Sequence, residues 1–81
     1  MIAVEYKAEF LKVVGKLDNF IKEKIKKQVA KIVQNPEIGK PMMHGRKGTR
    51  ELYIKPFRLS YAYLKEEQKI IFLDFYHKDE Q

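Results

Sequence analysis

The stretch that decides the fold is FRLSYAYLK, residues 57–65. Large apolar side chains alternate along it with small or polar ones, which is the period of two that a half-buried β-strand shows. One face of this strand is therefore apolar, and the other is small and polar around Arg58. The apolar positions are Phe57, Leu59, Tyr61 and Tyr63.

The segments on either side of this strand are also β-like. Residues 51–55 precede it, and residues 69–76 follow it after a turn at 66–68. The last segment contains the nearly continuous apolar run Ile70–Leu73, which is typical of a central strand. Residues 1–6 are rich in Ile, Val and Tyr, and they predict a short first strand.

Two helices are expected between the first strand and the others. From Tyr6 to Leu17 the apolar residues recur on one helical stripe, although Gly15 weakens the last turn. Asp18 and Asn19 are both good N-cap residues, so a second helix is expected to begin there and to end at Asn35–Pro36. Its apolar stripe consists of Phe20 or Ile21, Ile25, Val29, Ile32 and Val33.

These elements predict the fold class. The order is β-α-α-β-β-β, an α+β fold in which a helix hairpin packs on one face of a small, mainly antiparallel sheet. Residues 36–48, rich in glycine and proline, are expected to form a loop. An 81-residue chain has room for one core, so residues 1–81 form a single domain. No element remains to cover the second face of the sheet, onto which Arg58 points.

The composition excludes several kinds of site. The chain has no cysteine, which rules out a disulfide scaffold, a thiolate zinc site and a cysteine nucleophile. Its two histidines, His44 and His77, are far apart, so we expect neither a metal nor another cofactor. No apolar run reaches the roughly 18 residues of a membrane span, and residues 1–17 lack the pattern of a signal peptide. We therefore expect a cytoplasmic protein without a membrane partner.

The positive charge is divided between two regions. The chain has 17 Lys and Arg against 11 Asp and Glu, a net charge of +6. The lysines of residues 20–33 are typical of a solvated helix face. Residues 40–58 contain all three arginines and a single acid, Glu51. Because the planar arginine fork suits phosphate and aromatic residues lie nearby, this window is a candidate for binding nucleic acid, with general solubility as the alternative.

Phosphodiester chemistry is the reaction these residues could support. RNA cleavage without a metal needs a base for the 2′-hydroxyl, a cation for the charge that develops on phosphorus, and an acid for the leaving 5′-oxygen. Arg58 is the candidate cation and His77 the candidate acid or base, while Lys55 could hold a flanking phosphate. The alternative is that these are ordinary surface residues. The candidate RNA-binding residues are Arg46, Lys47, Arg50, Tyr76 and Lys78.

Four segments together resemble the RelE/ParE toxin superfamily. They are NPEIGKP (35–41), GTREL (48–52), FRLSY (57–61) and IFLDFYHK (71–78). With the preceding strand and helix pair, the resemblance covers nearly the whole chain. It implies a RelE-like microbial RNase fold and a toxin of a type II toxin–antitoxin pair.

The resemblance also implies two alternative activities. RelE-like members are ribosome-dependent mRNA endonucleases (mRNA interferases), whereas ParE-like members share the fold and inhibit DNA gyrase. Arg58 in Phe-Arg-Leu matches the arginine that stabilises the transition state, Lys55 matches a basic position of RelE, and His77 matches the histidine of the YoeB branch. Two residues depart from YoeB: Met42 replaces its catalytic glutamate, and Lys78 replaces its final tyrosine.

On this resemblance we expect a ribosome-dependent mRNA endonuclease that uses metal-independent attack by the 2′-hydroxyl. His77 and Lys55 would then carry the proton transfers, unless another group such as Glu51 contributes. The expected partners are a cognate antitoxin, the ribosome and mRNA. The alternatives are a ParE-like gyrase inhibitor with no catalysis of its own, and a small RNA- or antitoxin-binding module that has lost its activity.

Overall fold

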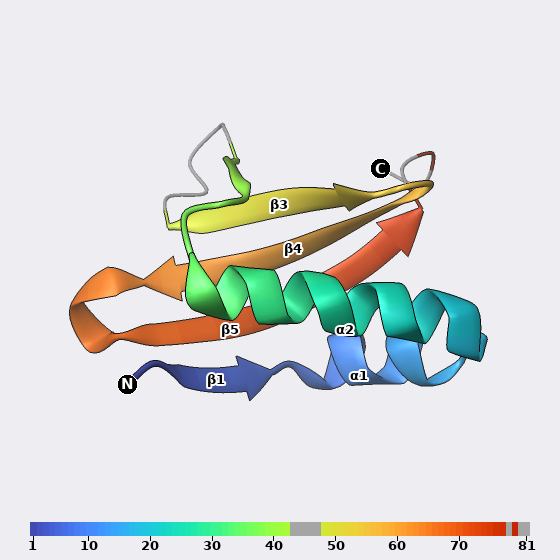
Figure 1. Cartoon of the computed structure of the whole chain (residues 1–81), viewed down its shortest axis with the longest axis horizontal. Helices are drawn as coiled ribbons and strands as arrows, with labels where there is room; N and C mark the ends of the chain where they lie inside the picture. The colour runs from blue at the N-terminus through green and yellow to red at the C-terminus, as the bar shows by residue number, and fades with distance from the viewer. Residues whose placement is uncertain (43–47, 78, 80–81) are drawn as a thin grey trace.

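The alternating segment forms the central strand of a five-stranded sheet in the computed structural model, which describes residues 1–42, 48–77 and 79. The order of the strands is β1-β5-β4-β3-β2; β1 pairs with β5 in parallel and the other pairs are antiparallel. Both helices lie on one face of the sheet, as Figure 1 shows, so the α+β prediction is confirmed. The elements are β1 (Ala3–Tyr6), α1 (Ala8–Gly15), α2 (Asn19–Gln34), β2 (Lys40–Pro41), β3 (Thr49–Ile54), β4 (Phe57–Leu64), the 3-10 turn η1 (Lys65–Glu67) and β5 (Lys69–His77).

The alternation of β4 separates a core face from an open face. Leu59 and Tyr61 are fully buried beneath the helices, and Phe57 and Tyr63 pack against the same core. Arg58 lies on the opposite face, which none of the described helices covers (Figure 1). The pattern therefore predicted both faces of this strand. The buried core consists of Phe10, Ile25, Ile32, Ile54, Leu59, Tyr61, Ile70, Phe72 and Phe75.

A β-bulge in β5 explains its continuous apolar run. Ser60 pairs with Asp74 and Tyr61 pairs with Phe72, so Leu73 has no residue opposite it. The extra residue shifts the alternation by one, and the core-facing side chain after the bulge is Phe75. The prediction of a central strand is confirmed, because β5 lies between β1 and β4.

The helices follow their capping signals. The Asp18 carboxylate accepts a hydrogen bond from the Ile21 N–H at 2.9 Å, so α2 begins where the sequence predicted. α1 ends at Gly15, two residues before Leu17, because glycine is a poor helix former. Across residues 1–42, 48–77 and 79, no helix combines the length and the apolar character that crossing a membrane requires.

One strand lies within the predicted loop. Lys40 and Pro41 of β2 pair with Glu51 and Arg50, and β3 begins at Thr49 rather than at Glu51. Proline is tolerated here because β2 is an edge strand that needs no outward-facing N–H. A strand of two residues has no alternation, so periodicity could not have revealed it.

Replacing Asp18 by alanine should lower the free energy of unfolding by about 1 kcal/mol, because α2 loses its N-cap acceptor. Asp18→Asn keeps an acceptor and should cost much less. Urea unfolding of both variants measures the difference. Equal losses would mean that the hydrogen bond to Ile21 is not what stabilises this end of the helix.

Candidate functional site

A single carboxylate joins two of the predicted site residues on the open face of the sheet. Glu51 on β3 forms an ion pair with Arg58 on β4, with Oε1 and Nη1 3.0 Å apart. The Tyr76 hydroxyl on β5 donates to the other carboxylate oxygen, Oε2, at 3.2 Å. Arg58 and Tyr76 are direct partners across β4 and β5. Three strands therefore bring a guanidinium, a carboxylate and a phenol together.

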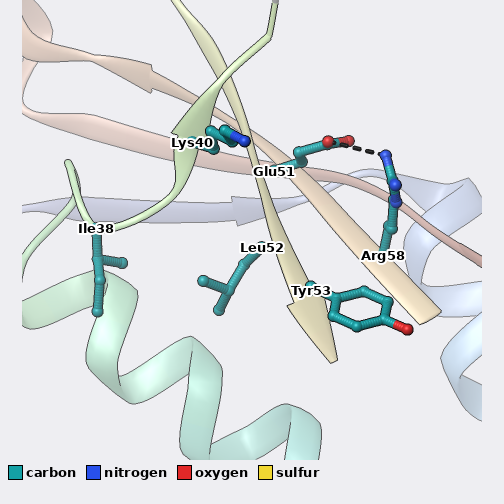
Figure 2. A pocket seen from close by; sticks show the side chains of 6 residues that line it. All are labelled: Ile38, Lys40, Glu51, Leu52, Tyr53 and Arg58. Atoms are coloured by element: carbon teal, nitrogen blue, oxygen red, sulfur yellow. Dashed lines mark hydrogen bonds and ion pairs between the residues drawn. The ribbon is translucent and has the colours of Figure 1, made fainter. Parts of the chain in front are cut away.

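A cavity of about 450 Å³ adjoins this cluster. It is lined by Ile38, Lys40, Glu51, Leu52, Tyr53 and Arg58, and Figure 2 shows these side chains on both sides of β3. Lys40 and Arg58 supply positive charge, Glu51 supplies negative charge, and Tyr53 is 51% exposed. Such a lining can hold a phosphate and stack against a base.

The geometry of the β3–β4 hairpin places Glu51 beside Arg58. The two-residue connection Lys55–Pro56 puts Tyr53 opposite Arg58 and Glu51 opposite Ser60. Glu51 and Arg58 are thus diagonal neighbours on one face, close enough for long side chains to meet. Sequence reasoning named both residues without pairing them, although the length of the connection was a usable signal.

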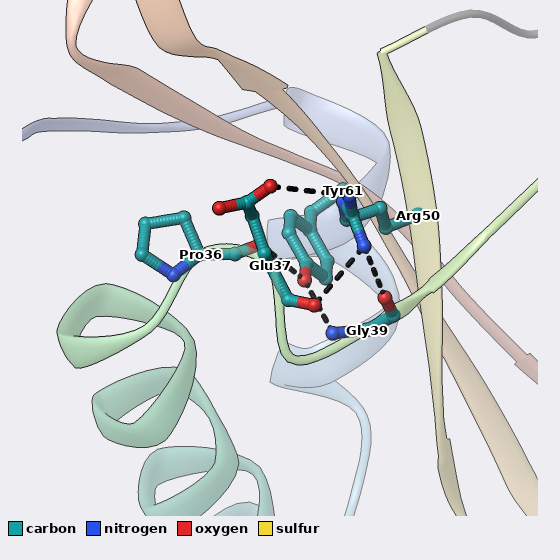
Figure 3. A network of polar contacts seen from close by, with 5 residues as sticks. All are labelled: Pro36, Glu37, Gly39, Arg50 and Tyr61. Carbon is teal, nitrogen blue, oxygen red and sulfur yellow. Dashed lines mark hydrogen bonds and ion pairs between the residues drawn. The ribbon is translucent and has the colours of Figure 1, made fainter.

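A second polar network joins the loop after α2 to the core face of the sheet (Figure 3). The Tyr61 hydroxyl donates to the Pro36 carbonyl at 2.7 Å and accepts from the Gly39 N–H at 2.9 Å. Arg50 Nη1 donates to the carbonyls of Glu37 and Gly39 at 3.0 and 2.7 Å. Its Nη2 also lies 3.7 Å from the Glu37 carboxylate. Arg50, predicted to bind RNA, is engaged here in holding the loop.

This network determines where the cavity forms. The anchored loop continues into β2, so its contacts with Tyr61 and Arg50 fix the positions of Ile38 and Lys40 at the cavity wall. Sequence reasoning missed this function of Tyr61 and Arg50, because an arginine fork suits backbone carbonyls as well as phosphates.

Four of the sequence-predicted residues lie at one end of the sheet but not on one face, namely Lys55, Arg58, Tyr76 and His77. Arg58 and Tyr76 share the open face, whereas His77 pairs with Phe57 on the helix side, their rings edge to face with centroids 5.6 Å apart. Lys55 is exposed in the turn between β3 and β4. The structure therefore brings Tyr76 to Arg58 and leaves His77 on the other side of the sheet.

Three further candidates, Arg46, Lys47 and Lys78, lie outside the described residues, as does His44. Within the described part of the chain, no three His, Asp or Glu side chains are grouped so that they could hold a metal ion.

A protein-family model defines the class of protein to which the chain belongs. The model of the ParE toxin of the type II toxin–antitoxin system parDE matches residues 4–81, nearly the full length of the chain. The chain belongs to this family and is a type II toxin of the RelE/ParE superfamily. No significant match was found among curated protein sequences.

Solved structures of RelE toxins share the fold. The isolated Escherichia coli RelE toxin is 18% identical, with a TM-score of 0.82 over 95% of this chain and 84% of that one. The intact E. coli RelBE toxin–antitoxin complex is also 18% identical, with a TM-score of 0.82 over 95% of this chain and 96% of that one. The Mycobacterium tuberculosis RelBE toxin–antitoxin complex is 20% identical, with a TM-score of 0.82 over 95% of this chain and 98% of that one. At these identities the likeness establishes the fold.

Gly39→Ala should destabilise the protein by about 1–3 kcal/mol, because overpacking has costs of this size. An added Cβ at Gly39 would lie 2.5 Å from the Tyr61 hydroxyl oxygen. Gly15→Ala is the matched control, since its Cβ meets nothing within 4 Å; there we expect no loss, or a gain of up to about 1 kcal/mol. Thermal unfolding of the two variants compares them, and equal stabilities would contradict the close approach.

Tyr61→Phe should cost about 1–3 kcal/mol, because the Pro36 carbonyl and the Gly39 N–H lose a buried partner. It should also change the response to alkaline pH. Burial raises the pKa of the Tyr61 phenol, an effect that the Gly39 N–H and Arg50 partly offset. The folded state therefore retains this proton above pH ~10, where the unfolded state loses it, and stability falls as the pH rises.

Urea unfolding between pH 8 and 11 tests this effect. The parent should lose more stability than Tyr61→Phe over that range. Lys69, whose pKa is raised by its hydrogen bond to Glu5, titrates in both proteins, so it cancels in the difference. Parallel curves for the two proteins would contradict the assignment to Tyr61.

Proposed function

We propose that this toxin is a ribosome-dependent mRNA endonuclease that needs neither a metal nor another cofactor. The observation that carries the proposal is the position of Arg58 on the uncovered sheet face, beside a cavity that Lys40 and Tyr53 also line. Extended RNA can reach such a face, and a guanidinium there can stabilise the charge that develops on phosphorus.

The other side chains have supporting roles in this proposal. Lys40 binds a phosphate oxygen, and Tyr53 and Tyr76 offer ring faces to bases. Lys55, in the turn at the same end of the sheet, holds a flanking phosphate. The proton-transfer roles of His77 and Lys55 stay predictions, as do the RNA-binding roles of Arg46, Lys47, Arg50 and Lys78.

Two features support the partners that we propose. A type II toxin is paired with an antitoxin, and two of the similar structures are complexes of RelE-type toxins with their antitoxins. The net charge of +6 and the open face favour an acidic antitoxin segment that covers this face. The same charge attracts the protein to the ribosome and mRNA in the cytoplasm.

Inhibition of DNA gyrase is the second candidate function. The matching family model is that of ParE toxins, and Glu51 neutralises Arg58 in the free protein. A ParE-like toxin would act by binding its target and would not need Arg58 as a catalyst.

Arg58→Ala should reduce ribosome-dependent cleavage at least about 100-fold, because removing one charge-stabilising donor typically has an effect of this size. Primer extension on translated message, with purified toxin added, measures the cuts. Lys27→Ala removes an exposed cation of α2 and should cleave like the parent.

Two results would contradict the endonuclease. One is an absence of ribosome-dependent cuts by the parent protein, and the other is an Arg58→Ala variant that remains as toxic as the parent. A gyrase supercoiling assay on the same preparations tests the second candidate, which predicts inhibition by both proteins.

A further inference from the structure

Glu51 is an acid on a face that we propose binds an anion, the phosphate of RNA. Its side chain is 22% exposed, and its two oxygens contact Arg58 and Tyr76 at 3.0 and 3.2 Å. The groups that face it are Lys40 on β2, Arg58 on β4 and Tyr76 on β5. Glu51 therefore lies between cations on the two strands that flank β3.

Other acids of the open face are engaged elsewhere. Asp74 accepts a hydrogen bond from the N–H of Phe75, its own neighbour, at 2.8 Å. Glu5 forms an ion pair with Lys69 at 2.8 Å at the β1 side of the sheet. In the part of the chain that the structure describes, Glu51 is the acid that lines the cavity beside Arg58.

We infer that Glu51 is the general base of the cleavage reaction, an inference that rests on the proposed endonuclease function. Arg58 contacts Glu51 through one guanidinium nitrogen, Nη1, and its planar fork has further N–H donors. A phosphate held by those donors would lie next to the carboxylate. Arg58 would thereby bring the scissile phosphate and the base together while stabilising both negative charges.

The step balances without a metal. The Glu51 carboxylate takes the proton of the 2′-hydroxyl, and the 2′-oxygen forms a bond to phosphorus. The bond between phosphorus and the 5′-oxygen breaks, and that oxygen takes a proton from water in the open cavity. The resulting hydroxide takes the proton from Glu51, which restores the carboxylate. The products are a 2′,3′-cyclic phosphate and a 5′-hydroxyl.

Two variants of Glu51 separate chemistry from structure. Glu51→Gln keeps the size of the side chain and an oxygen acceptor for Arg58 or Tyr76, but it cannot take up the proton. We expect its single-turnover cleavage of ribosome-bound message to fall at least about 100-fold, within the range for losing a general base. Glu51→Asp should recover part of the rate. Glu66→Gln, an exposed acid in η1, is the control and should match the parent.

Two further measurements distinguish a general base from a residue that only holds Arg58 and Tyr76 in position. The cleavage rate of the parent should fall toward acidic pH, because a general base must be unprotonated to act, and Glu51→Gln should lose that acidic limb. Binding of a short RNA by fluorescence anisotropy should be unchanged or tighter in Glu51→Gln, because a negative charge has been removed from the site. Far-UV circular dichroism checks that the variants are folded.

The outcomes separate this inference from the proposed function. If the parent protein cleaves mRNA and Glu51→Gln cleaves it as fast or faster, Glu51 only forms an ion pair with Arg58 and takes no part in the chemistry. The inference is then overturned. If Glu51→Gln is slow but keeps the acidic limb, the base is another group and the inference is again overturned. If the parent makes no ribosome-dependent cuts, the endonuclease function itself fails.

Discussion

The buried hydroxyl of Tyr61 is the constraint on which the rest of the structure depends. Its ring is fully buried in the core, so its hydroxyl must find partners within the protein. Those partners are the Pro36 carbonyl and the Gly39 N–H, which lie in the loop after α2. The loop must therefore return to the sheet at this point. β2 then pairs with β3, and Lys40 reaches the cavity wall.

Features that depend on local pattern could be predicted from the sequence. The two faces of β4 follow from alternation over eight residues, and the start of α2 follows from Asp18, whose side chain bonds to an N–H three residues away. β2 could not be predicted, because its two residues form a strand only by pairing with Glu51 and Arg50. Nothing within residues 40–41 distinguishes them from a loop.

The candidate site was predictable to the same extent. Arg58 could be assigned to the uncovered face because that assignment needs only the period of its own strand. The partners of Arg58 and Arg50 could not be assigned, because an arginine fork accepts carboxylates, carbonyls or phosphates alike. Which one it meets depends on residues that pair across strands, such as Glu51, or that lie in a distant loop, such as Gly39.

The bulge at Leu73 also links the core to the open face. Asp74 and Phe75 are neighbours, and only one of them can face the helices; Phe75 does so and is 1% exposed. If β5 continued from the pair of Tyr61 and Phe72 without the bulge, Asp74 would pair with Leu59 and enter the core, and Phe75 rather than Tyr76 would pair with Arg58. The placement of Phe75 in the core therefore also determines which ring lies beside Arg58, and a change confined to the bulge would replace the Tyr76 phenol there with a phenyl group that cannot donate to Glu51.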